Sequence, residues 1–467
     1  MGHHFKYINY LFLISALSLL ISWAWVSTSI ILTILVILIL ALWSILDFTF
    51  ALFLLVGIAI CQGKVGIMFH TPAEVIIDDI YVLEIYFPVF LASFLINRLN
   101  AKSQLAVWHR YTTENLVLYI FFIFWALIGI FAADWKVRAY IQTTHLIIFF
   151  SYLTVLSTFS TEKLIVFLRL FALWGLVYFI LAFMSTSGLS FEFDNIKLAK
   201  WLSLKLIFFE GKKRASLLSP PAITAVFFGL CAWSAYLAGL LKQRRKYLYF
   251  VIAFFITLGI FYTRTRSEMV AFLFAGFAFV AILGWKKGYV VRGLTLCLIY
   301  VICVWIISSG LDLSRALLRI KASTDVGETA SLGIRLGLWK DGLLNLGQTY
   351  GIGEGTGGFF KYKAQWPHAH NVYFSVLFDL GLIGSLLWVM IYLNLWRHLI
   401  YGIRLVPEKS DEWLILVAFL AFFVEISLTS LLQHEYTHFI WWLFPGLLLA
   451  ATNNAFKKHD LMRSYAQ

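Results

Sequence analysis

The segment QWPHAHNVYF, residues 365–374, places two histidines and an asparagine directly before a long apolar run. Histidine suits general-base chemistry because the pKa of an imidazole lies near neutral pH. An asparagine beside it can orient a ligand or the imidazole ring. We therefore take His370 as the candidate base, with Asn371 and His368 as candidates for positioning a substrate. The alternative is that an interfacial histidine is structural, and the clustering lowers its weight only modestly.

Four arginines fall in segments that we expect on the same side of the membrane as His370: Arg214, Arg264, Arg266 and Arg335. A guanidinium group is planar and can bind two phosphate oxygens at once. Several arginines at one membrane-level site therefore predict a pyrophosphate group as their ligand. The alternative is that each arginine reaches for lipid head groups, as interfacial cations often do.

Two further motifs fit known patterns. GEGTGG, residues 353–358, matches the dinucleotide-binding pattern GxGxxG, and HEYTH, residues 434–438, matches the zinc-protease pattern HExxH. The first needs a preceding strand in a βαβ unit, whereas we expect a loop here, so a flexible or tightly turned loop close to a ligand is favoured. The second falls in a short turn between predicted spans and has no clear third ligand. Zinc proteolysis therefore stays a minor alternative, and no metal site is predicted.

The composition defines the kind of scaffold that must carry these residues. Of 467 residues, 61% are hydrophobic and only 13% are charged, and the mean hydropathy is +0.85. A soluble domain could not bury that much apolar surface, so the chain is predicted to be a polytopic membrane protein. Apolar runs of about 20 residues favour helices over a barrel, which would show alternating segments of about 10 residues. The predicted fold class is all-α, a bundle of about 12–14 transmembrane helices.

The apolar runs place predicted spans near 8–26, 28–45, 48–63, 81–97, 115–133, 142–160, 163–184, 219–241, 247–263, 268–285, 289–309, 371–396, 413–432 and 438–453. The pair within 28–63 is divided near Asp47. Basic loops at 96–104, 242–246, 285–288, 396–404 and 456–460 then all fall on one side. The positive-inside rule assigns that side, and both termini, to the cytoplasm.

The long connections lie on the other side and define the expected organisation. We expect an N-terminal bundle at 1–184, a loop at 185–218, further helices at 219–309, a large loop at 310–370, and C-terminal helices with a cytoplasmic tail at 371–467. Within the large loop, residues 331–346 show apolar residues at helical spacing. This pattern predicts an amphipathic helix at the membrane surface.

Four motifs in order resemble one known family: YTRTRSEMVAFLFAG, RLGLWKDGL, YGIGEGTGGF and HAHNVYFSVLFDLGLIG, all within 255–390. They are similar to the Ser/Thr-Arg turn, the Arg-x-x-x-Trp helix, the glycine-rich loop and the His-x-His-Asn segment of the O-antigen ligase and polymerase superfamily. The chain departs from the family at Pro220-Pro221-Ala222, where Pro-Asn is usual after the first arginine. It also has Asp379 where the family often has glutamate.

The resemblance implies a glycosyltransferase of the GT-C kind that is metal-independent, inverting and without a cofactor. The donor would be a glycan on undecaprenyl pyrophosphate, and the acceptor would be another glycan or a lipid A core sugar. Arg214, Arg264, Arg266 and Arg335 would bind the pyrophosphate, with Arg266 also catalytic. His370 would activate the acceptor, positioned by Asn371 and His368. Asp379 is expected to serve helix packing.

Several functions remain open at this stage. We favour an O-antigen or surface-polysaccharide polymerase in the bacterial inner membrane, with a periplasmic active face. A ligase that joins O-antigen to lipid A core during lipopolysaccharide biosynthesis would use the same residues. A flippase or other transporter would need polar residues along a path through the bundle, whereas here they gather at one face. Besides the bilayer, a chain-length regulator protein is a partner to consider, and no nucleic acid is expected.

Overall fold

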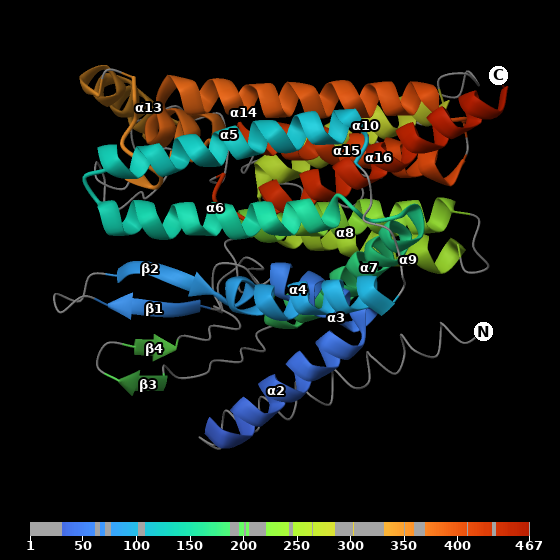
Figure 1. Cartoon of the computed structure of the whole chain (residues 1–467), viewed down its shortest axis with the longest axis horizontal. Coiled ribbons are helices and arrows are strands. Elements are labelled where there is room, and N and C mark those ends of the chain that lie inside the picture. Colours follow the sequence, from blue (N-terminus) through green and yellow to red (C-terminus); the bar gives the residue numbers. More distant parts are fainter. Residues whose placement is uncertain are drawn as a thin grey trace.

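The structure is a computed structural model that describes residues 30–60, 66–70, 76–100, 108–186, 196–199, 202–204, 221–241, 246–263, 265–284, 302, 331–349, 351–358, 369–408, 410–431 and 436–466. Its helices are α2 (Ile30–Leu46), α3 (Phe48–Ile60), α4 (Val82–Asn100), α5 (Arg110–Ala132), α6 (Lys136–Leu156), α7 (Thr161–Thr186), α8 (Pro221–Leu240), α9 (Lys246–Tyr262), α10 (Arg266–Gly284), α13 (Ser331–Gln348), α14 (Val372–Leu405), α15 (Asp411–Ser430) and α16 (Ile440–Ala466). Long helices lie side by side in a bundle (Figure 1).

The described helices confirm the predicted class, a polytopic helical membrane protein. Six of them are long and apolar enough to cross a membrane: α5, α6, α7, α8, α14 and α15. The predicted break near Asp47 is also present, because α2 ends at Leu46 and α3 begins at Phe48. Asp47 produces this break as an N-cap, since its Oδ1 accepts a 2.9 Å hydrogen bond from the Thr49 amide.

A small sheet lies at one end of the helical bundle, in addition to the predicted all-α fold. Its four antiparallel strands run in the order β2 (Ile76–Tyr81), β1 (Gly66–His70), β4 (Leu202–Leu204), β3 (Ile196–Ala199). Two of these strands come from the loop predicted at 185–218, and two from the connection before α4. The sheet lies at the left end in Figure 1, the same end as the α5–α6 turn. Strands this short have no clear alternating pattern, so the sequence did not predict them.

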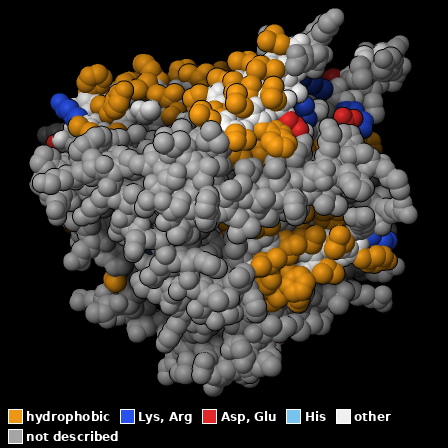
Figure 2. Space-filling view, turned by 90° about the horizontal axis from the view of Figure 1, so that it is seen from below, with side chains coloured by type: hydrophobic (Ala, Val, Ile, Leu, Met, Phe, Trp, Pro, Cys, Tyr) orange, Lys and Arg blue, Asp and Glu red, His pale blue; other side chains and the backbone are white. Residues whose placement is uncertain are grey.

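The apolar surface and core are those of a membrane bundle. Described side chains on the face shown in Figure 2 are mainly hydrophobic, with few charged groups among them. Inside, large aromatic residues from distant helices pack together, and Trp388, Trp442 and Tyr119 are fully buried. The rings of Tyr119 and Trp442 lie 5.2 Å apart and link α5 to α16. This packing holds the elements that carry the candidate site.

Helix α14 contains a sharp reversal where the sequence predicted one continuous span at 371–396. Gly381 has φ 66° and ψ −163° inside the helix. The ring centroids of Tyr373 and Tyr392 are 6.0 Å apart, although a straight helix would separate these residues by about 28 Å. Residues 372–380 therefore fold back along the longer limb. As a result the start of α14 lies beside buried Tyr392 and not at the end of the bundle.

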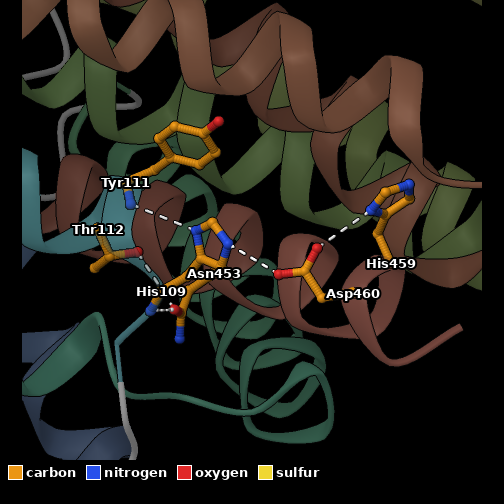
Figure 3. A network of polar contacts seen from close by, with 6 residues as sticks. All are labelled: His109, Tyr111, Thr112, Asn453, His459 and Asp460. Carbon is orange, nitrogen blue, oxygen red and sulfur yellow. Dashed lines mark hydrogen bonds and ion pairs between the residues drawn. The ribbon is translucent and has the colours of Figure 1, made fainter. Parts of the chain in front are cut away.

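A polar network fastens the start of α5 to α16 (Figure 3). The buried Asn453 Oδ1 accepts hydrogen bonds from the His109 amide at 2.7 Å and the Thr112 hydroxyl at 3.4 Å. His109 Nε2 lies 3.1 Å from Asp460 Oδ2, and His459 contacts the same carboxylate. The network joins the two chain segments far from the glycine-rich loop, so we assign it to stability.

Asn453→Ala is expected to lower the stability of the detergent-solubilised protein by about 1–3 kcal/mol, because it leaves the partly buried His109 amide and the buried Thr112 hydroxyl without their acceptor. Thermal unfolding measures the change. His459→Ala is the control, since that side chain sits at the exposed edge of the network, and surface substitutions usually change stability by about 0.5 kcal/mol or less. Equal melting temperatures for Asn453→Ala and the unmodified protein would contradict the assignment.

Candidate active site

The His370–Asn371 turn begins α14. His370 is half-buried, and its φ of 51° is in the left-handed region that few residues other than glycine adopt. Asn371 is the N-cap, since its Oδ1 accepts a 3.0 Å bond from the Phe374 amide. Its Nδ2 donates to the Leu431 carbonyl at the end of α15, at 2.8 Å. Both amide atoms of Asn371 thus hold the turn that presents His370, while direct contact of Asn371 with substrate stays a prediction.

Helix α13 matches the amphipathic helix predicted at 331–346 and docks against this turn. The Trp339 Nε1–H donates to the Ala369 carbonyl at 2.8 Å, and the Trp339 ring stacks on Phe374 with centroids 4.9 Å apart. Arg335 lies one helical turn before Trp339 on the same face. Burial lowers the pKa of the Arg335 guanidinium, which still remains a cation in proteins. The helix that bears Arg335 is therefore docked on the segment that carries His370.

The predicted cationic turn joins α9 to α10. Thr263 and Thr265 are buried and share a 3.1 Å hydrogen bond between their hydroxyls, and Arg266 is the first residue of α10. The N-terminus of a helix carries unpaired amides and a partial positive charge, which favour an anion. Of Arg266 the structure describes the backbone alone. Arg214, Arg264 and His368 lie outside the described residues, so their roles stay predictions.

Both turns attach to the same end of α15. Glu268, in the first turn of α10, accepts a 2.6 Å hydrogen bond from the Thr429 hydroxyl. Two residues later the Leu431 carbonyl accepts the bond from Asn371. The turn that bears Arg266 and the turn that bears His370 are therefore neighbours in space, although about 100 residues separate them in the chain.

The glycine-rich loop at 351–358 binds to the reversal of α14 through its backbone. Its four glycines with positive φ, between 75° and 90°, are Gly351, Gly353, Gly355 and Gly357. The Gly355 amide donates to the Asp379 carbonyl at 2.8 Å, and the Leu382 amide donates to the Gly351 carbonyl at 2.9 Å. These bonds satisfy the backbone groups that the reversal at Gly381 releases from the helix. Of the two predicted forms the loop is the tightly turned one, and α13, not a strand, precedes it.

Asp379 clamps this loop to the last turn of the chain. Its Oδ2 accepts hydrogen bonds from the Gly357 amide at 2.9 Å and from the buried Tyr436 hydroxyl at 3.2 Å. Tyr436 belongs to HEYTH, whose residues 434 and 435 lie outside the described part. The motif falls in the turn between α15 and α16, as predicted. Its tyrosine helps to hold the glycine-rich loop, through the shared carboxylate of Asp379. Within the described residues, no group of three or more histidine, cysteine or acidic side chains could hold a metal.

The N-terminal half of the chain forms the other wall of the loop. The Thr143 hydroxyl of α6 donates to the Thr356 hydroxyl at 3.1 Å, and the Trp125 indole of α5 donates to the Leu380 carbonyl at 2.7 Å. A Cβ at Gly355 would lie 2.8 Å from the Gly129 carbonyl oxygen, so only glycine fits this close approach. These contacts could not be predicted from the sequence, because isolated threonine and tryptophan residues carry no spacing signal.

Gly381→Ala is expected to lower the yield of folded protein and the transfer activity by at least about ten-fold, because alanine is strained at positive φ and its Cβ would collide with the Gly351 carbonyl oxygen. Size-exclusion chromatography and a transfer assay measure the two effects. Gly337→Ala in α13 is the matched control, because nothing lies within 4 Å of its Cβ position and alanine favours a helix. Wild-type yield for Gly381→Ala would contradict the reversal.

The fold is that of a multi-pass membrane protein in which the turn that bears His370 and the turn that begins at Arg266 meet at the end of α15. Residues 250–389 match the family model described as O-antigen ligase. This match spans the four motifs and confirms the resemblance to the O-antigen ligase and polymerase superfamily. It supports a membrane glycosyltransferase of this type.

No curated protein matches the chain. One matching solved structure is described as "Structural coordination of polymerization and crosslinking by a peptidoglycan synthase complex", with 14% identity and a TM-score of 0.42 over 75% of this chain and 100% of that one. A similarity at that level carries no conclusion about this protein.

Proposed function

We propose that the protein transfers a glycan from undecaprenyl pyrophosphate to a sugar acceptor, and that it acts as a polymerase of O-antigen or another surface polysaccharide. The observation that carries the proposal is the meeting of two turns at the end of α15, one bearing Arg266 and one bearing His370. Arg335 approaches from α13. A base and several cations at one site are what the displacement of a pyrophosphate by a hydroxyl requires.

In the proposed reaction the acceptor hydroxyl oxygen attacks the anomeric carbon of the donor. The bond between that carbon and the phosphate oxygen breaks, and the lipid pyrophosphate leaves with the electron pair. His370 takes the hydroxyl proton. Arg214, Arg264, Arg266 and Arg335 stabilise the negative charge of the leaving group, in the role that a divalent cation takes in other transferases. Attack from the face opposite the leaving group gives inversion.

The docked loop and α13 support a site that lies within the bundle, toward the end that carries the small sheet, at the left in Figure 1. We infer that this end faces the periplasm of a bacterial inner membrane, and that the termini are cytoplasmic. The acceptor would enter from this side while the lipid of the donor remains in the bilayer. The loop regions proposed at 185–218 and 310–370 would cover the glycan.

A reconstitution distinguishes the polymerase from the ligase. Purified protein is incubated with undecaprenyl-pyrophosphate-linked repeat units, first without and then with lipid A core. A ladder of longer lipid-linked glycans without the core supports the polymerase. Transfer that appears only after the core is added supports the ligase instead. Products in neither incubation would contradict both, and zinc analysis with chelator treatment would then test HEYTH.

A further inference from the structure

Glu268 is a carboxyl group buried in the membrane bundle. It belongs to the first turn of α10 and has 0% of its surface exposed. Burying a carboxyl group costs free energy unless it is hydrogen-bonded, and ionisable residues inside membrane bundles are mostly retained for function. Its Oε2 accepts the Thr429 hydroxyl at 2.6 Å, which is a short bond between two fully buried side chains. An apolar pair would join these helices without that cost.

The position of this bond indicates its role. Glu268 follows Arg266 by two residues on α10, and Thr429 precedes Leu431 by two residues on α15. The Leu431 carbonyl in turn holds Asn371, the neighbour of His370, at 2.8 Å. Two hydrogen bonds at the end of α15 therefore connect the backbone that carries the arginine to the backbone that carries the histidine.

We propose that Glu268 and Thr429 are positioning residues for glycan transfer, which hold Arg266 in register with His370 through the end of α15. The proposal rests on the function proposed above. Neither residue needs to touch the substrate. A base and a cation that act on the same transition state must keep their separation, because a displacement of about 1 Å can reduce a rate by about 10²-fold.

A second buried carboxyl group, on the same helix as Thr429, provides a matched control. Glu425 lies one turn before Thr429, is also 0% exposed, and accepts the Trp233 indole of α8 at 2.6 Å. Gly229 leaves room for it, since a Cβ there would collide with the carboxylate. This bond has the same length and burial, but it attaches α8, which carries none of the proposed site residues. The Trp233 ring also packs on Phe272 of α10, with centroids 5.0 Å apart, and phenylalanine keeps an aromatic ring at this contact. Trp233→Phe therefore breaks a bond of the same length that does not join the two turns.

The test compares variants of the full-length purified protein by melting temperature and by transfer kinetics with the lipid-linked donor. Thr429→Val is expected to reduce kcat on the order of 10–100-fold, with a smaller change in KM, because the two groups act together in the transition state. Thr429→Ser keeps the hydroxyl and should restore kcat to within about three-fold. Glu268→Ala should resemble Thr429→Val, and Glu268→Gln, whose amide oxygen still accepts, should restore most of kcat.

Trp233→Phe should lower the melting temperature as much as Thr429→Val does while keeping kcat. Equal losses of kcat in Thr429→Val and Trp233→Phe would mean that the bond between Glu268 and Thr429 only stabilises the fold, and this result would overturn the proposal. Wild-type kcat in Thr429→Val would also overturn it. The proposal would also be overturned if Glu268→Gln were inactive while Thr429→Val stayed active, because the charge of the carboxylate would then matter and not the hydrogen bond. If the unmodified protein extends or transfers no glycan, the proposed function fails and this inference fails with it.

Discussion

His370→Ala is expected to reduce glycan transfer by about 10²–10⁴-fold while the protein remains inserted, because the variant removes the group that takes the acceptor proton. The measurement is product formation from the lipid-linked donor, normalised to folded protein. The loss should appear in kcat, since the imidazole acts on the acceptor in the transition state.

The backbone at this position allows a stricter version of the experiment. Because φ is 51° at His370, His370→Gly removes the imidazole and relaxes the backbone, since glycine adopts this region readily. An inactive but stable His370→Gly variant would separate loss of the base from damage to the fold. His459→Ala, in the polar network between α5 and α16 (Figure 3), is the control for loss of a histidine. Full activity in His370→Gly would show that His370 is not the base.

Arg266→Ala is expected to reduce transfer by about 10²–10³-fold, which is the effect of removing one preorganised donor from a developing anion. The residue begins α10, where the helix end adds its own partial positive charge. The transfer activity of Arg266→Lys should lie between that of the unmodified protein and that of Arg266→Ala, because lysine keeps the charge but cannot bind two phosphate oxygens at once. Transfer assays and binding of the lipid-linked donor together measure the effect.

The matched control for Arg266 is Arg404, an exposed arginine in the last turn of α14. It lies at the end of the bundle away from the glycine-rich loop, in a predicted cytoplasmic basic segment. Arg404→Ala should keep transfer within about two-fold, since it changes a surface charge remote from the site. If Arg266→Ala and Arg404→Ala behave alike, Arg266 only contacts lipid head groups, which is the alternative that the sequence left open.

The structural class of this protein, a helical membrane protein, could be predicted from local sequence because it depends on composition and on the spacing of apolar residues. Long apolar runs require helices in a bilayer whatever the details of packing. The amphipathic pattern at 331–346 likewise predicted α13, and Asp47 marked the boundary between α2 and α3. The order of the four motifs predicted the family domain later matched at 250–389. None of these inferences needs a contact between distant residues.

The path of α14 could not be predicted in the same way. Glycine is common inside membrane helices, so Gly381 within an apolar run resembles the middle of a span. The positive φ of Gly381 is stabilised by hydrogen bonds from its neighbours to the loop at 351–358. That loop is more than 20 residues away in the sequence, so the apolar pattern around Gly381 does not indicate these bonds. For the same reason Asp379 was expected to serve helix packing, whereas it holds the Gly357 amide and the Tyr436 hydroxyl.

The sequence by itself determined a polytopic helical membrane protein, the order of its motifs, and which residue types could bind pyrophosphate or accept a proton. These properties follow from side-chain chemistry and from the short-range period of the chain. Only the tertiary structure decided that the Arg266 and His370 turns meet at the end of α15, and that Glu268 and Thr429 join them. The physical reason is that these contacts arise from packing between helices. The residue pattern of one helix does not specify which other helices it packs against.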